Sequence, residues 1–218
     1  MAAIVEDKYG ILWIGTTGGG LNRFDRATEK FSRYLNDANN PRSLSDNTVN
    51  FIHQDKSGAL WIGTESGGLN LLKSETGEFT RYQHDFANPN SLSDYNLKSI
   101  FEDESGTFWI GTAYSGMESF DRTTGKFTHY KPDQIDTQSP NYPVLSIYGD
   151  KSGALWVGTE GVGLHKFNRQ TGVFTHYRHD PNIAGSLSDN AVRTIYEDRS
   201  GMLWIGTKDG LNKFPLAR

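Results

Sequence analysis

The chain of 218 residues has 22 Lys and Arg against 26 Asp and Glu residues, a formal net charge of −4, 12% aromatic residues and no cysteine. The acidic balance without any basic cluster argues against nucleic-acid binding, and the absence of thiols excludes disulfides and zinc–thiolate sites. No apolar run approaches the roughly 20 residues of a membrane helix, and the first residues lead directly into a repeat, so no signal peptide is expected in this chain.

Five tryptophans, which are all the tryptophans in the chain, recur at intervals of 48, 48, 47 and 48 residues. Each begins the tetrapeptide Trp-Ile-Gly-Thr, or Trp-Val-Gly-Thr in the fourth repeat; the positions are Trp13, Trp61, Trp109, Trp156 and Trp204. A constant period of this length predicts one supersecondary unit that is copied along the chain. The repeated residues are therefore expected to build the scaffold, and the residues that differ between repeats to carry any specificity.

The second repeat shows what one unit contains. Its β-forming segments are residues 49–54, 60–64, 69–72 and 79–82, separated by Asp-Lys-Ser-Gly, Glu-Ser-Gly-Gly and Ser-Glu-Thr-Gly. In such turns Asp opens the turn and Gly supplies a positive φ. Four short strands with tight turns predict an antiparallel meander, in which Gly63 leaves room for a neighbouring sheet or a large side chain. Helical periodicity is absent.

The same pattern recurs in the other repeats. The Asp-x-x-Gly turn begins at Asp7, Asp55, Asp103, Asp150 and Asp198, and the fourth-strand Phe-x-x-Tyr motif begins at Phe31, Phe79, Phe127 and Phe174. A long linker rich in Asn, Asp and Ser leads from each fourth strand to the next repeat. We therefore predict an all-β fold, a β-propeller of four-stranded antiparallel blades with 47 to 48 residues each. The approximate blades are residues 1–46, 47–94, 95–141, 142–189 and 190–218, and the last one lacks its outer strand.

The repeated pattern Val-x-x-Ile-x-x-Asp-x-x-Gly-x-Leu-Trp-Ile-Gly-Thr-x-x-Gly-Gly-Leu resembles the two-component regulator propeller repeat. The resemblance covers essentially the whole chain. It implies the periplasmic sensing part of a bacterial hybrid sensor kinase, in which many such repeats precede a membrane segment and kinase domains, and it implies a ligand that is often an oligosaccharide. This chain has fewer repeats than is usual there, no membrane helix and no kinase. The resemblance therefore implies that signalling belongs to a parent protein, and that this chain at most binds a ligand.

The fifth repeat ends after its third strand, and the amino terminus offers no spare outer strand to complete it. Three arrangements remain open: a five-bladed ring with one three-stranded blade, an open arc that completes a larger ring with another copy, and an excised piece that is unstable. The unpaired third strand would be an exposed edge. We therefore expect self-association through the incomplete terminal blade.

The turns between second and third strands and the long linkers are expected at one face of the propeller, where ligands usually bind. The repeated residues there are interpreted as structural: Thr16, Thr64, Thr112, Thr159 and Thr207 within their own turns, and Ser-Asp pairs at 45–46, 93–94 and 188–189 in the linkers. The residues that vary are the ligand-binding candidates: Glu65, Tyr95, Lys98, Tyr114, Tyr142, Glu160 and Arg193. Aromatic faces beside hydrogen-bonding and cationic groups suit a sugar, including an acidic one. Ordinary variation between blades is the competing explanation for each residue.

No Ser-His-Asp order, cysteine nucleophile or metal motif is visible, so no catalytic residue, metal or cofactor is expected. Glu65 and Glu160 are the candidate carboxylates for an acid–base pair, and they come from the same turn of different blades. Streptogramin-lyase propellers carry Trp-Phe-Thr-Glu where this chain has Trp-Ile-Gly-Thr. The favoured function is therefore a non-catalytic ligand sensor, periplasmic or extracellular in the parent protein. A self-assembling interaction scaffold is the alternative, and a polysaccharide lyase or hydrolase is less favoured.

Overall fold

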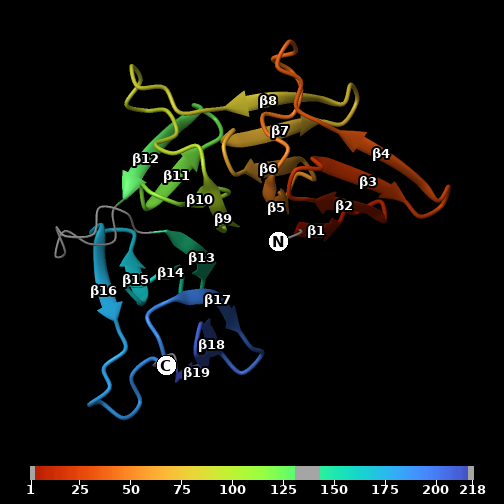
Figure 1. The fold of residues 1–218 in the computed structure, drawn as a ribbon. Coiled ribbons are helices and arrows are strands. Elements are labelled where there is room, and N and C mark those ends of the chain that lie inside the picture. Colours follow the sequence, from red (N-terminus) through yellow and green to blue (C-terminus); the bar gives the residue numbers. More distant parts are fainter. Residues whose placement is uncertain (1–2, 131–142, 216–218) are drawn as a thin grey trace. The chain divides into compact units, whose positions relative to one another are not determined.

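The computed structural model describes residues 3–130 and 143–215. All regular secondary structure within these ranges consists of β-strands (Figure 1). The strands of the first two sheets are β1 (Ala3–Glu6), β2 (Ile11–Gly15), β3 (Leu21–Asp25), β4 (Lys30–Tyr34), β5 (Val49–Gln54), β6 (Leu60–Thr64), β7 (Leu69–Lys73) and β8 (Glu78–Tyr82). The others are β9 (Leu97–Glu102), β10 (Phe108–Thr112), β11 (Met117–Asp121), β12 (Lys126–Tyr130), β13 (Val144–Gly149), β14 (Leu155–Thr159), β15 (Leu164–Asn168), β16 (Val173–Tyr177), β17 (Val192–Glu197), β18 (Met202–Thr207) and β19 (Gly210–Pro215).

These strands form five antiparallel sheets in which each strand pairs with its neighbours in the chain. Four sheets have four strands, in the orders β1-β2-β3-β4, β5-β6-β7-β8, β9-β10-β11-β12 and β13-β14-β15-β16, and the fifth has the order β17-β18-β19. Each four-stranded meander is the blade of a β-propeller. The predicted all-β propeller fold is confirmed, and so is the prediction that the fifth blade lacks its outer strand among the described residues.

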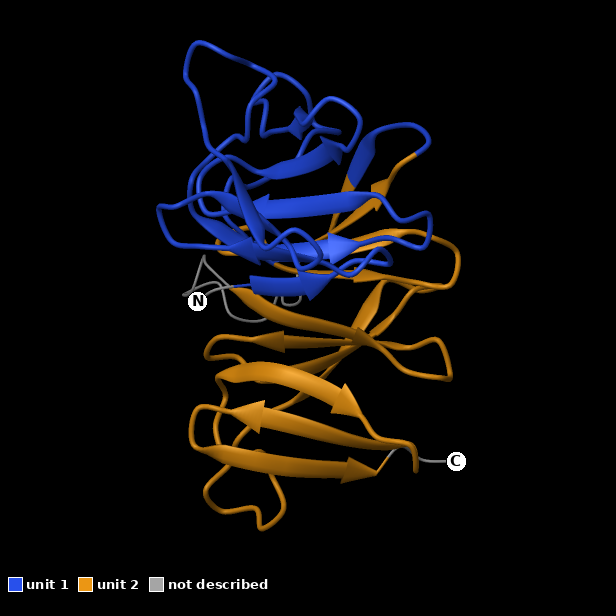
Figure 2. Cartoon of the chain, turned by 90° about the vertical axis from the view of Figure 1, so that its right-hand side faces the viewer, with its two compact units in different colours: residues 1–98, 123–127 blue, residues 99–122, 128–218 orange. Residues whose placement is uncertain are grey.

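The chain divides into two compact units, which Figure 2 colours separately. Unit 1 comprises residues 1–98 and 123–127, and unit 2 comprises residues 99–122 and 128–218. Unit 1 therefore holds the sheets β1–β4 and β5–β8, whereas unit 2 holds the sheets β13–β16 and β17–β19 together with β10 and β11.

Within each unit, the core lies between consecutive sheets. In unit 1, Trp13 of β2 belongs to one buried cluster with Ile52 and Leu72 of the second sheet. In unit 2, the Trp156 ring of β14 packs edge to face on Phe214 of β19, with ring centroids 5.3 Å apart. Such tilted aromatic pairs add to the burial of apolar surface. Each of these tryptophans therefore joins its own sheet to the next one, as the period predicts.

The glycine after each Trp-Ile pair permits close approach. A Cβ added at Gly15 would lie 2.5 Å from Cγ1 of Val49, which belongs to the next sheet. At Gly63 the same atom would lie 2.1 Å from the ring of Phe51, its cross-strand partner. The prediction that this glycine makes room is confirmed, because the space is taken by a neighbouring sheet in one blade and by a large side chain in another.

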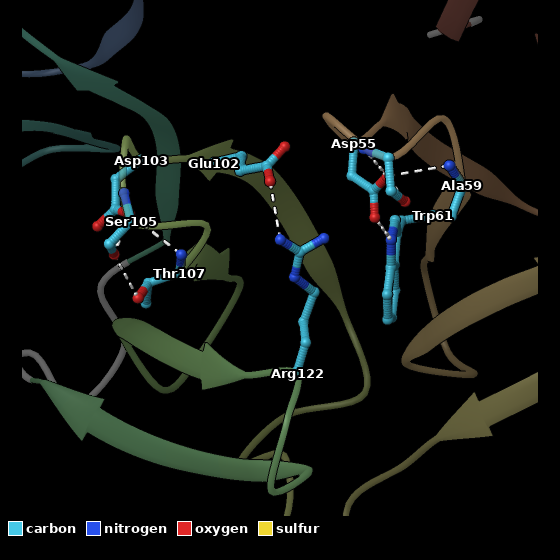
Figure 3. Close-up of polar contacts among 9 residues, drawn as sticks. Asp55, Ala59, Trp61, Glu102, Asp103, Ser105, Thr107 and Arg122 are labelled. Atoms are coloured by element: carbon cyan, nitrogen blue, oxygen red, sulfur yellow. Dashed lines mark hydrogen bonds and ion pairs between the residues drawn. The ribbon is translucent and has the colours of Figure 1, made fainter.

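An aspartate, buried in the first four blades and half-buried in the fifth, bonds both to the first turn and to the tryptophan of each blade. In the fourth blade, Asp150 Oδ2 accepts a 2.8 Å hydrogen bond from Trp156 Nε1. Its Oδ1 accepts from the amides of Ser152 and Ala154, at 2.9 and 3.0 Å, and from the Ser152 hydroxyl at 2.6 Å. Figure 3 shows parts of the same pattern in the second and third blades. The indole is bonded in this way in all five blades, by Asp7, Asp55, Asp103, Asp150 and Asp198.

The pKa values of three of these aspartates are lowered. Burial alone would raise the pKa of Asp103 and Asp150, but hydrogen bonds from serine, indole and backbone donors outweigh it, and each pKa lies below its ordinary value. At Asp103 the charge of Arg169 also lowers the pKa; its Nη1 lies 2.9 Å from Oδ2. At Asp198 the hydrogen bond from Ser200 is the largest cause of a lowered pKa, followed by that from Trp204. The turn therefore selects the charged carboxylate, because it offers only donors.

Asp150→Ala is expected to destabilise the protein by about 2–4 kcal/mol, because the buried Trp156 indole N–H and two turn amides lose their acceptor. Asp198→Ala is the matched control. Asp198 accepts the same hydrogen bonds, but its indole partner Trp204 is half-buried, so water can replace the lost acceptor. Urea unfolding followed by tryptophan fluorescence should show the larger loss for Asp150→Ala. Equal losses would show that the carboxylate acts only on its exposed turn.

The lowered pKa values also predict how stability depends on pH. A carboxyl group with a lower pKa in the folded state stabilises the fold above its unfolded pKa, near 3.9, and loses this contribution as pH falls through the folded value. We expect these groups to contribute fully at pH 5–7 and progressively less below about pH 4. Unfolding free energies at pH 7, 5 and 3 test this. Asp150→Ala should lose less stability between pH 5 and 3 than the unaltered protein, and an equal loss would contradict the assignment.

Candidate functional site

The turns between the second and third strands are closed by the repeated threonine. Thr64 Oγ1 donates a 2.9 Å hydrogen bond to the carbonyl oxygen of Gly68, and the same bond, at 2.8 to 3.1 Å, is made in the other blades by Thr16, Thr112, Thr159 and Thr207. In three blades this side chain lies fully inside the fold: Thr64, Thr112 and Thr159 are 0% exposed. The structural interpretation of these threonines is confirmed.

The linker before the second blade is fastened to that blade by Asn70 of β7. The Asn70 side chain accepts a 3.0 Å hydrogen bond from the Ser45 amide and donates a 2.7 Å bond to the Ser45 hydroxyl. Asp46 accepts from the Ser66 amide at 2.9 Å. In the fifth blade, Asn212 holds Ser188 in the same way, at 2.9 Å for both bonds. For these two linkers, the prediction that Ser-Asp pairs brace them is confirmed, and Asn70 and Asn212 are the partners that sequence reasoning did not name.

In unit 1, two linkers meet at the turn that carries Glu65. The Glu65 amide donates to the Thr48 carbonyl at 3.0 Å, and the Gly68 amide donates to the Tyr95 carbonyl at 2.9 Å. Glu65 is exposed, and Tyr95 is 41% exposed, with its ring edge to face on His84 at 5.3 Å. The turn that carries Glu65 therefore contacts the segment that carries Tyr95. Lys98, which is half-buried, lies three residues after Tyr95 on β9.

In unit 2, the turn that carries Glu160 has the same construction. The Glu160 amide donates to the Pro143 carbonyl at 3.0 Å, and Glu160 forms an isolated antiparallel bridge with Ala191. Arg193 lies two residues after Ala191 on β17, and both Glu160 and Arg193 are exposed. The structure therefore places Glu160 next to the segment that leads into Arg193.

Tyr114 lies in the corresponding turn of the third blade and is 56% exposed. Tyr142 lies outside the described residues. The predicted candidates therefore fall into two described groups: Glu65, Tyr95 and Lys98 in unit 1, and Tyr114, Glu160 and Arg193 in unit 2. Each unit thus holds a tyrosine, a carboxylate and a cation among the candidates; the described contacts bring the Glu65 turn to Tyr95 and the Glu160 turn to the segment before Arg193, and Tyr114 lies in a turn of another blade. That set can stack on an apolar ring face and form hydrogen bonds to hydroxyl or carboxyl groups.

The carboxyl groups with shifted pKa values lie at the other end of each blade. Asp103, Asp150 and Asp198 begin the turn between first and second strands, whereas Glu65 and Glu160 follow the second strand. These three aspartates are therefore structural and are separated from the candidates by the length of the second strand.

A cavity of about 540 Å³ in unit 2 opens near the Asp turn end of the fourth blade, between Ser152, Lys166, Arg169 and Thr175. It contains none of the predicted residues. Among residues 3–130 and 143–215, no group of three or more His, Asp or Glu side chains is placed to hold a metal ion. In the same ranges there is no helix that could cross a membrane.

Sequence reasoning missed one variable position inside the blades. The third-strand position of Asn22, Asn70 and Asn212 is occupied by Glu118 in the third blade and by His165 in the fourth, and both side chains are 0% exposed. Glu118 Oε1 lies 3.3 Å from Nδ1 of His129, and His165 Nδ1 lies 2.6 Å from Nδ1 of His176. Aligning the repeats at their tryptophans would have revealed this replacement of asparagine by an ionisable side chain.

Asn70→Ala is expected to cost about 1–3 kcal/mol, because it leaves the Ser45 amide without its acceptor at a site that is 0% exposed. Asn22→Ala is the matched control, since the half-buried Asn22 donates only at 3.5 Å, to two carbonyls of its own blade. Thermal unfolding should separate the two variants. A loss for Asn22→Ala as large as for Asn70→Ala would contradict the brace.

The two-component regulator propeller family matches the chain five times, at residues 1–18, 43–66, 91–114, 138–161 and 186–209, which together are more than half of its length. No curated protein matches. Among solved structures, the extracellular domain of the putative hybrid two-component system BT3049 from B. thetaiotaomicron is 30% identical, with a TM-score of 0.82 over 96% of this chain and 28% of that one. The extracellular domain of BT4673 from the same organism is 25% identical, with a TM-score of 0.78 over 95% of this chain and 26% of that one.

Virginiamycin B lyase from Staphylococcus aureus shares the fold at 16% identity and a TM-score of 0.69, over 100% of this chain and 70% of that one. This similarity is one of fold alone. The chain spans little more than a quarter of the two B. thetaiotaomicron domains. The five Asp–Trp blades and the five family matches lead to one conclusion: the chain belongs to the two-component regulator propeller family.

Proposed function

We propose that this chain is a non-catalytic sensing part of a bacterial two-component signalling protein, periplasmic or extracellular in its parent, that binds an oligosaccharide or another small ligand. The main support is the 30% identity to the extracellular domain of a hybrid two-component system. Family membership and the repeated blade supply the scaffold for such a sensor. Signalling itself is assigned to the parent protein.

The candidates at the second turns support binding at this end of the blades. Tyr95 and Tyr114 expose 41% and 56% of their surface, although large aromatic side chains are usually more deeply buried. Glu65, Glu160 and Arg193 are exposed beside such turns and add hydrogen-bonding groups of both charges. Sugars offer apolar ring faces surrounded by hydroxyl groups, so this mixture favours a sugar over a purely apolar ligand.

A catalytic role has less support. Glu65 is the only candidate carboxylate in unit 1 and Glu160 the only one in unit 2, so neither unit by itself supplies from the candidates the two carboxyl groups that a glycosidase needs within about 10 Å of one bond. The virginiamycin B lyase similarity, at 16% identity, does not carry an activity. We therefore infer that the ligand is released unchanged.

Calorimetric titration with neutral and acidic oligosaccharides tests the proposal. Tyr114→Ala and Tyr95→Ala should each weaken a binding oligosaccharide by about 1–2 kcal/mol if their rings stack on it. Tyr9→Ala is the matched control, because Tyr9 is 76% exposed and lies in an Asp turn at the other end of its blade. No binding across a broad panel by folded protein would refute the proposal, as would an equal loss for Tyr9→Ala.

The same panel distinguishes a sensor from an enzyme. Each oligosaccharide is incubated with the protein and analysed for new reducing or unsaturated ends. We expect none. Cleavage that disappears in Glu65→Gln or Glu160→Gln would replace the sensor by a hydrolase or lyase.

A further inference from the structure

Consecutive blades meet through two different faces that repeat along the chain. The leading face of a blade carries its tryptophan and the first apolar residue of its third strand, such as Trp156 and Leu164. The trailing face of the following blade carries an isoleucine of the first strand, such as Ile195, and the third-strand Phe214. In unit 1 the same faces bring Trp13 and Leu21 together with Ile52, Leu72 and Phe79.

In the fifth blade, the leading-face positions are exposed. Leu211 pairs with Gly206 as Leu164 pairs with Gly158, but Leu211 is 66% exposed and Leu164 is 0% exposed. Tyr196 is 61% exposed, whereas Tyr148, at the same place in the fourth blade, packs on a buried cluster. Trp204 is half-buried, in contrast to Trp156 at 1%.

In the first blade, the trailing-face positions are exposed. Ile4 is 64% exposed, and the equivalent Ile52 is 7% exposed. Phe31 is 67% exposed, and the equivalent Phe79 is 4% exposed. Phe31 packs on Phe24 at 4.6 Å, as Phe174 packs on Phe167 at 4.6 Å. The first blade thus exposes two apolar residues whose equivalents in the second blade, Ile52 and Phe79, are buried.

These two faces are complementary in the way that consecutive blades are, where a leading-face tryptophan packs on a trailing-face phenylalanine. Across consecutive blades Trp109 packs on Phe167 at 5.7 Å, and Trp156 packs on Phe214 at 5.3 Å. The fifth blade supplies Trp204 and the first supplies Phe24, the two halves of that pair. Lys213 lies over the Trp204 ring at 5.8 Å, as Lys166 lies over Trp156 at 5.3 Å in an interior contact. A charge at this place is therefore compatible with docking.

We propose that the leading face of β17–β19 in one copy of this chain docks on the trailing face of β1–β4 in a second copy. The contact would bury Tyr196, Trp204 and Leu211 against Ile4, Phe24 and Phe31. Because it joins two different surfaces, it is heterologous, and each dimer keeps one free face of each kind for further copies. It differs from pairing through the exposed edge of β19, which would use backbone hydrogen bonds and no face of the first blade.

Sedimentation of the whole chain over a range of concentrations tests this proposal. The unaltered protein should form concentration-dependent dimers and longer assemblies. Leu211→Lys and Phe31→Lys should each weaken association by at least about ten-fold, since each replaces an apolar side chain of one face by a charge that docking would bury. The matched controls are Ile183→Lys and Phe86→Lys, in linkers, where the side chains are 59% and 87% exposed; they should leave association unchanged.

Mixing the two variants gives the sharpest result. Leu211→Lys keeps an intact trailing face and Phe31→Lys an intact leading face, so a mixture should form a one-to-one dimer that does not grow. Circular dichroism establishes that each variant is folded, and Tyr196→Lys with Ile4→Lys is a second pair if either is not. A monomer at every concentration, association that Phe31→Lys leaves unchanged, or a mixture without dimer would each overturn the proposal.

Discussion

The hydrogen bond between the aspartate of the first turn and a tryptophan indole is the interaction on which each blade depends. One carboxylate oxygen ends the first turn by accepting backbone amides, and the other fixes the indole six residues later, as at Asp150 and Trp156. The turn determines where the second strand begins, and the indole determines how that strand meets the next sheet. Because both tasks use one side chain, the register of a hairpin and the packing between two blades are set together.

Much of this fold could be predicted from the sequence, because the signals are local and repeated. The turn sequences and β-forming runs predict strands such as β5 and β6 with the bounds observed. The Asp–indole bond was not predicted, although both residues were recognised as repeated. A spacing of six residues places the two side chains on one face only after the hairpin register is known. The arrangement of the blades is a different question, which no local pattern addresses.

The candidate site could be predicted only in part. The turns and linkers were recognised as neighbours, and the bonds from Glu65 to Thr48 and from Gly68 to Tyr95 confirm this locally. Which varying residues bind a ligand stays a prediction, because exposure and charge are compatible with both binding and neutral drift. Tyr142 lies outside the described residues. The family supplies the class of function, whereas the residues that would choose a ligand are those that differ from the family pattern.

The fourth blade shows how a departure from the repeat changes local physics. Its preceding linker lacks the Ser-Leu-Ser-Asp sequence, so no serine of that motif is present for an asparagine to hold. At the asparagine position, His165 bonds within its own blade, to Thr159 at 3.3 Å and to His176 at 2.6 Å. The sheet satisfies this buried polar position itself, as a buried polar group requires. At this third-strand position the fourth blade therefore holds a buried side chain with partners in its own sheet, whereas Asn70 and Asn212 bond to the linkers at Ser45 and Ser188.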